Sequence, residues 1–152
     1  MRSKFNFKLT TIFWVLVGVF VVIVSDMLLI PTPALRVYLL PLMFISWAAF
    51  FVLGLALIVL IKKRKAEEPQ GWLKKFLLLT GASAVGFPVF VILHNLVYGL
   101  FIYFFGQDIW DKIGLGGDEP FFFFLATIVC PLGFLVGAVG TIVLFLKKRK
   151  RQ

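Results

Sequence analysis

Apolar residues occupy four long blocks of the chain, separated by short polar segments. The blocks are nearly continuous and lack the one-sided 3.6-residue spacing of a helix on a soluble protein. A helix needs roughly 20 apolar residues to cross a bilayer core of about 30 Å. The pattern therefore predicts an all-α integral membrane protein with four transmembrane helices, at about residues 9–30, 35–65, 72–105 and 120–147.

The third block is the longest, and the rest of the chain is organised around it. Its apolar part, Phe76 to Phe105, would be about 45 Å long as a helix, which exceeds the hydrocarbon core. It contains Pro88 and a run of small residues, Gly81 to Gly86. We expect this helix to tilt, to bend at the proline or to protrude from the membrane.

Prolines and glycines mark the connections between blocks. Pro31-Thr-Pro33 predicts a very short turn between the first two helices, and Pro41 falls in the first turn of the second. The segment 106–120 is the one substantial loop. Its apolar residues at 109, 110 and 113 predict a short interfacial segment that lies outside the membrane.

Composition supports one membrane domain over residues 1–152. The chain is 61% hydrophobic and 15% charged, whereas soluble domains are about half apolar and a quarter charged. The first block is longer than a signal-peptide core, and Val22 to Ser25 makes a poor cleavage site, so we expect it to remain as a helix. The net charge of +9 comes from short clusters beside apolar blocks, which argues against nucleic acid as a partner.

Basic residues predict the orientation of the helices. Fourteen of the sixteen lysines and arginines fall at the two chain ends and between the second and third blocks. By the positive-inside rule, both termini are cytoplasmic, the four helices form an antiparallel bundle, and the acidic loop lies outside a plasma membrane. Nine of these residues are candidate contacts to anionic lipids on the cytoplasmic side: Lys62, Lys63, Arg64, Lys65, Lys147, Lys148, Arg149, Lys150 and Arg151.

A stripe of small residues runs along the fourth block. Ala126, Cys130, Gly133, Gly137 and Gly140 are spaced by 4, 3, 4 and 3 residues, which keeps them on one face of a helix. Small residues allow helix backbones to approach closely within a membrane. The stripe predicts a helix contact, either with the first or third helix of the same chain or with a second copy or a partner helix.

Polar residues near the outer edge of the membrane form the one candidate site. Counted along their helices, Asp26 and His94 lie at similar depth. Arg36, Asn95 and Tyr98 are also placed near this edge. Such groups avoid lipid by facing protein or water. We expect an outer polar cluster of Asp26, Arg36, His94, Asn95 and Tyr98, which either pins the first helix to the third or binds a proton, a metal or a ligand.

Catalytic chemistry has little support in the sequence. His94 is the one histidine and Cys130 the one cysteine, so neither a metal site nor a nucleophile beside a base is indicated. We expect no catalytic residues, no metal and no cofactor. The expected function is that of a non-catalytic accessory or self-associating subunit, as a homo-oligomer or in a larger membrane complex. The alternative is a component of a small-solute transporter or ion channel.

Overall fold

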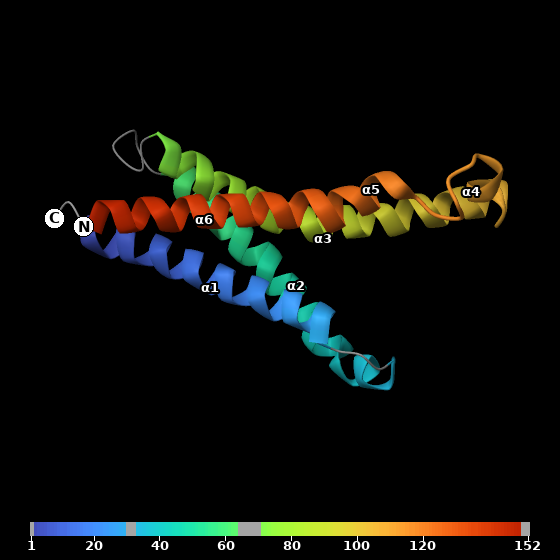
Figure 1. Ribbon diagram of the computed structural model, residues 1–152, viewed down its shortest axis with the longest axis horizontal. Coiled ribbons are helices and arrows are strands. Elements are labelled where there is room, and N and C mark those ends of the chain that lie inside the picture. Colours follow the sequence, from blue (N-terminus) through green and yellow to red (C-terminus); the bar gives the residue numbers. More distant parts are fainter. Residues whose placement is uncertain (1, 30–32, 64–70, 150–152) are drawn as a thin grey trace.

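The structure is a computed structural model that describes residues 2–29, 33–63 and 71–149. Its secondary structure, within these residues, is helical. In chain order the elements are α1 (Arg2–Leu29), α2 (Pro33–Lys62), α3 (Trp72–Phe105), α4 (Ile109–Lys112), α5 (Pro120–Phe124), the π-helical turn η1 (Leu125–Val129) and α6 (Cys130–Arg149). Figure 1 shows how they are arranged.

Four membrane-length helices are confirmed within the described residues. Their apolar spans are Lys8–Asp26, Leu39–Lys62, Trp72–Phe105 and Pro120–Lys147. Some predicted bounds were wrong. α1 begins at Arg2, because the polar start contains no residue that breaks a helix. α2 begins at Pro33, which is well suited to a first helical position, and Pro41 therefore lies in its third turn. The predicted end of this helix at residue 65 lies outside the described residues.

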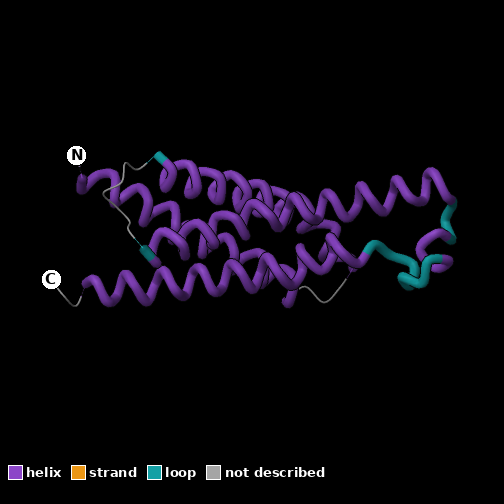
Figure 2. Tube along the Cα trace, turned by 90° about the horizontal axis from the view of Figure 1, so that it is seen from above, coloured by secondary structure: helices purple, strands orange, loops and turns teal. Residues whose placement is uncertain are grey.

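The helices form two pairs. α1 packs with α2, and α3 packs with α5, η1 and α6, while α2 and α3 join the pairs. The N and C labels lie at one end of the molecule, which we call the terminal end, and α4 lies at the other, which we call the α4 end (Figures 1 and 2). The two pairs are close together near the terminal end and diverge toward the α4 end (Figure 1).

Glycines let α3 approach helices on both of its sides. Toward α2, a Cβ built on Gly81 would lie 2.8 Å from an Ile58 side-chain carbon, and one built on Gly54 would lie 2.9 Å from the Cβ of Ala84. Toward α6, a Cβ built on Gly137 would lie 2.7 Å from the backbone nitrogen of Thr80. A side chain at any of these positions would force the helices apart. Because both α2 and α6 make such close contacts with α3, α3 is the central helix of the fold.

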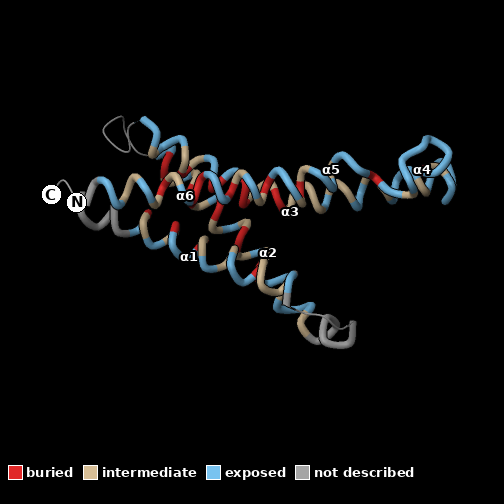
Figure 3. The backbone as a smooth tube through the Cα atoms, in the orientation of Figure 1, coloured by how far each residue is buried: buried red, intermediate tan, exposed pale blue. Residues whose placement is uncertain are grey.

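The best-buried side chains lie where the two pairs converge. Phe13 and Leu16 of α1, Leu57 of α2, Leu77 of α3 and Phe134 of α6 are almost completely buried (Figure 3). Their burial on all sides explains why the helices stay together at this level, because close packing rather than exclusion of water holds helices together in lipid.

Aromatic rings mark the level at which the pairs begin to separate. The rings of Phe20 and Phe134 stack with centroids 4.3 Å apart. Phe50 contacts both Phe134 and Phe87, at 5.1 and 6.4 Å. Both helix pairs contribute rings to this cluster. The cluster therefore joins the pairs at the level where they begin to diverge toward the α4 end.

A π-helical turn interrupts the last long helix. The N–H of Cys130 donates to the carbonyl of Leu125, which is five residues earlier instead of four. Pro131 follows directly and has no N–H to donate. The hydroxyl of Thr127 donates to the carbonyl of Phe123 over 2.7 Å. The turn thus places the irregular hydrogen bonding just before the proline, and regular helix resumes in α6.

Candidate functional site

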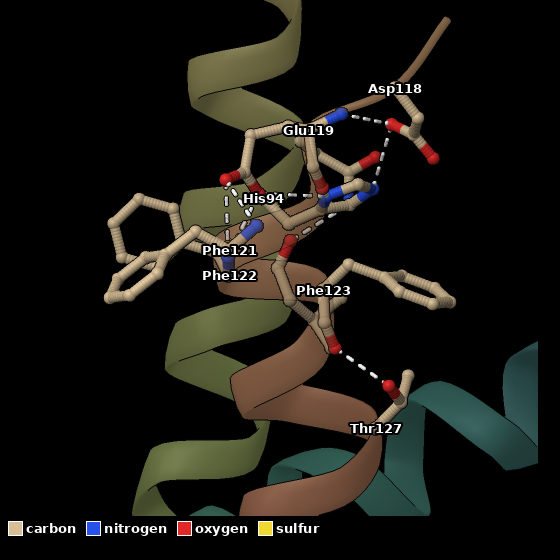
Figure 4. A network of polar contacts seen from close by, with 9 residues as sticks. His94, Asp118, Glu119, Phe121, Phe122, Phe123 and Thr127 are labelled. Carbon is tan, nitrogen blue, oxygen red and sulfur yellow. Dashed lines mark hydrogen bonds and ion pairs between the residues drawn. The ribbon is translucent and has the colours of Figure 1, made fainter. Parts of the chain in front are cut away.

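His94 lies on α3 and faces the start of α5 (Figure 4). Its Nδ1 is 3.0 Å from the backbone carbonyl oxygen of Glu119. A carbonyl oxygen only accepts, so Nδ1 carries the hydrogen and donates it in this bond. The same nitrogen is 3.3 Å from Oε2 of the Glu119 side chain. His94 therefore connects α3 to a residue 25 positions later in the chain.

Glu119 caps the helix that follows it. Its Oε1 accepts from the N–H of Phe121 at 2.8 Å, and its Oε2 accepts from the N–H of Phe122 at 2.9 Å. Pro120 occupies the first helical position, where its missing N–H has no cost. Glu119 is only 5% exposed, and these bonds supply the partners that a buried carboxylate requires.

Asp118 lies on the other side of the imidazole. Its Oδ1 is 3.7 Å from Nε2 of His94, which is within ion-pair reach but too long for a hydrogen bond. The same oxygen accepts from the N–H of Glu119 at 2.7 Å. The ring is thus placed between two successive carboxylates at the start of α5 (Figure 4). We call His94, Asp118 and Glu119 the clasp.

An aromatic stack continues from the clasp toward α4. The ring of Tyr98 lies 6.4 Å from that of His94 and 6.0 Å from that of Trp110, and is nearly parallel to the latter. Trp110 also stacks on Phe101 at 4.8 Å and is 3% exposed. The stack fixes α4 against α3, so the predicted interfacial segment folds back onto the protein at this point.

The predicted outer polar cluster assembles only in part. Tyr98 lies beside His94, as described above. Asn95 is exposed and donates to the carbonyl of Val91 in its own helix over 2.8 Å.

Asp26 lies near the end of α1, which diverges from α3 (Figure 1). Arg36 belongs to α2, and its side chain lies outside the described residues. Among the described carboxylates, those placed against His94 are Asp118 and Glu119.

The small-residue stripe lies against α3. A Cβ built on Gly133 would lie 2.6 Å from the hydroxyl of Ser83, and one built on Gly140 would lie 2.6 Å from the ring of Phe76. Ala126 and Cys130 are buried as well. Of the two predicted kinds of contact, the structure places the stripe in a contact within the chain.

The basic residues that the structure describes lie at the ends of their helices. Lys62 and Lys63 are exposed at the end of α2, and Lys147 is exposed in α6. Lys148 and Arg149 also belong to α6, but their side chains lie outside the described residues, as do Arg64, Lys65, Lys150 and Arg151. At the start of α3, Nζ of Lys75 lies 4.6 Å from the ring centre of Trp72, a cation–π contact suited to a membrane interface.

Three residues of this region, Asp118, Glu119 and Trp110, were not expected from the sequence to have a role in the site. The signal for a helix start at Glu119 is Pro120 followed by an apolar run, because proline is favoured at the first helical position. Within the described residues, no group of three or more histidine, cysteine, aspartate or glutamate side chains is arranged to hold a metal ion. The clasp holds the end of the loop after α3 against that helix.

Comparison of the chain with protein-family models, with curated proteins and with solved structures finds no match. The chemistry and the shape of this chain are therefore the basis for assigning its function.

Proposed function

We propose that this chain is a non-catalytic accessory subunit that binds a partner membrane protein through the last turns of α3. The observation that carries the proposal is a stripe of exposed apolar side chains, Leu96, Leu100, Tyr103 and Phe104. Their spacing puts them on one face of the helix. We call these four residues the α3-end surface.

The length of α3 supports a position for this surface at and beyond the outer edge of the hydrocarbon core. Leu96 follows Phe76, where the apolar part of α3 begins, by 20 positions, or about 30 Å along the helix axis, which equals the core thickness of about 30 Å. An average tilt of about 20° shortens this distance by only a few ångströms. Tyr103 and Phe104, which are 81% and 69% exposed, lie farther out still. A contiguous apolar patch in this position is typical of an interaction site.

The clasp and the aromatic stack give this surface a rigid base. Because they fasten the α4 segment to one side of α3, the opposite side of the helix is held ready for a partner. Preorganisation of this kind lowers the entropic cost of binding.

We further propose the membrane placement that the basic residues indicate. The four spans form an antiparallel bundle in the plasma membrane, with both termini cytoplasmic and the α4 end outside. The exposed lysines at the ends of α2 and α6 would then lie at the cytoplasmic face, where they contact anionic lipid headgroups. The acidic residues Asp108, Asp111 and Asp118 would lie on the outer side.

The test is affinity purification of the tagged full chain in a gentle detergent, followed by mass identification. A partner should co-purify in stoichiometric amount with the wild type and be lost from Tyr103→Ala combined with Phe104→Ala. The matched control is Phe44→Ala combined with Ile45→Ala, because these α2 residues are similarly exposed but lie within the predicted hydrocarbon core. Equal recovery of the partner by both variants would reject the surface. Recovery of a homo-oligomer alone would replace the partner subunit with self-association.

A further inference from the structure

A cleft lies between the two helix pairs, at the level where they begin to diverge. Its lining includes Phe20 and Val24 of α1, Phe50 of α2, Phe87 of α3 and Phe134 of α6, together with Ser83 and Cys130. Its empty volume is about 320 Å³, including the part that opens to the surroundings. We call it the hairpin cleft. It is separate from both the clasp and the α3-end surface.

The walls of the cleft exclude most classes of ligand. They are made of aromatic rings and aliphatic carbons, with one hydroxyl and one thiol. A polar or charged ligand would lose its hydration here without gaining hydrogen-bond partners. An apolar void of this kind also stays dry. The chemistry therefore selects a hydrocarbon.

Depth and direction bring the cleft into contact with the lipid. Ser83 and Phe87 follow Phe76, where the apolar part of α3 begins, by 7 and 11 positions, which corresponds to about 11 and 17 Å along α3. These distances place the cleft near the middle of a core of about 30 Å. Because the helix pairs diverge from this level toward the α4 end (Figure 1), the cleft opens toward the chains of one leaflet.

Size decides between an acyl chain and a helix of another protein. The empty volume of about 320 Å³ includes open space outside the cleft, and the cavity itself measures only about 30 Å³. A helix with its side chains is about 10–12 Å wide and does not fit between these walls, whereas a segment of an acyl chain, which carries no side groups, does. Leaving the cleft empty would deprive its rings of contacts on one side. We propose that the hairpin cleft binds one acyl chain of a membrane lipid from the leaflet on the α4 side.

The test uses the full chain in phosphatidylcholine vesicles that contain a phosphatidylcholine with a photoactivatable diazirine in the middle of one acyl chain. After illumination, adducts are mapped by mass spectrometry. We expect labelling at Cys130 and Ser83, which are buried but line the cleft, in addition to exposed positions such as Leu132. Labelling of the wild type at exposed positions alone would overturn the proposal.

A pair of valine variants tests where the chain binds. In Val24→Trp the indole competes for the volume of the cleft, so labelling at Cys130 should fall by about fivefold or more relative to Leu132. Val22→Trp introduces the same side chain at an exposed position of the same helix and should leave the ratio unchanged. Equal ratios in the two variants would contradict binding in the cleft.

A distance measurement covers the case in which Val24→Trp does not fold. Spin labels at the exposed positions Leu28 of α1 and Phe124 of α5 report the separation of the two helix pairs in vesicles. Pairs that remain apart, combined with labelling of Cys130 in the wild type, support an acyl chain between them. Closure of the pairs onto each other would leave no room for the chain and would overturn the proposal. Both outcomes are independent of whether the α3-end surface has a partner.

Discussion

Gly137 of α6 lies directly against the backbone of Thr80 in α3. A Cβ added to this glycine would be 2.7 Å from the Thr80 nitrogen and 2.9 Å from the carbonyl oxygen of Phe76. The hydroxyl of Thr80 donates to that same carbonyl over 2.9 Å, so the threonine side chain is already held in place. Backbone atoms cannot move aside as the end of a flexible side chain can, and even a methyl group must separate the two helices.

The first prediction concerns this contact. Gly137→Ala should destabilise the protein by about 1–3 kcal/mol, because the added methyl group overlaps backbone atoms. The control is Gly18→Ala in α1, where a Cβ meets no atom within 4 Å and alanine should stabilise the helix by about 0.5–1 kcal/mol. Thermal unfolding in detergent measures both. Equal melting temperatures for the two variants would show that the α3–α6 contact is not tight.

The second prediction concerns the clasp. His94→Ala removes the donor to the Glu119 carbonyl and leaves a buried group without its partner, at a cost of about 1–3 kcal/mol. We expect faster proteolysis and faster hydrogen exchange across residues 106–119. Asn95→Ala is the neighbouring control, since Asn95 is exposed and bonds within its own helix, and its effect should stay within about 0.5 kcal/mol. A loop equally protected in both variants would contradict the clasp.

The third prediction separates the two possible partners of His94. A double-mutant cycle of His94→Gln with Glu119→Gln should show a coupling energy of about 0.5–3 kcal/mol, because the residues are in contact. The cycle of His94→Gln with Asp26→Asn should be additive within about 0.5 kcal/mol, because α1 and α3 diverge at this end. Coupling of His94 to Asp26, with additivity between His94 and Glu119, would instead support the contact expected from the similar depth of His94 and Asp26 in the membrane.

The fourth prediction concerns orientation. Single cysteines at Lys63 and Lys112, both exposed, are introduced into a Cys130→Ser background. A membrane-impermeant thiol reagent applied to intact cells should label position 112, and position 63 only after the membrane is opened. Labelling of both from the same side would reject the proposed topology.

The number and approximate positions of the membrane helices could be predicted because bilayer thickness sets a length that hydropathy reveals directly. The stripe of small residues could also be recognised, since glycines spaced by three and four positions along an apolar segment are typical of close helix packing. Gly54 was not recognised, because the residues three and four positions away on either side of it are large. Its significance depends on Gly81 and Ala84 of the next helix, and no pattern within α2 reveals them.

The candidate site was harder to predict than the fold. A count of residues along each helix gives depth but says nothing about lateral position, so Asp26 and His94 were placed at one level without any sign that α1 diverges. Glu119 belongs to the predicted loop, and the return of that loop onto α3 depends on Trp110 packing against Tyr98 and Phe101. Such contacts between distant segments are set by tertiary packing and not by local pattern.

The π-helical turn before Pro131 contains one residue more than a regular α-helical turn. It therefore changes the rotation of α5 about the helix axis relative to α6. Each residue of an α-helix turns the chain by about 100°. Deletion of one residue within Leu125–Val129 would therefore swing Glu119 and its cap away from His94, while Gly133 and Gly137 would keep their places against α3. The extra residue of the π-helical turn thus aligns the clasp independently of the contact between the α6 glycines and α3. The α4 end of this protein could therefore change in evolution without any repacking of α3 against α6.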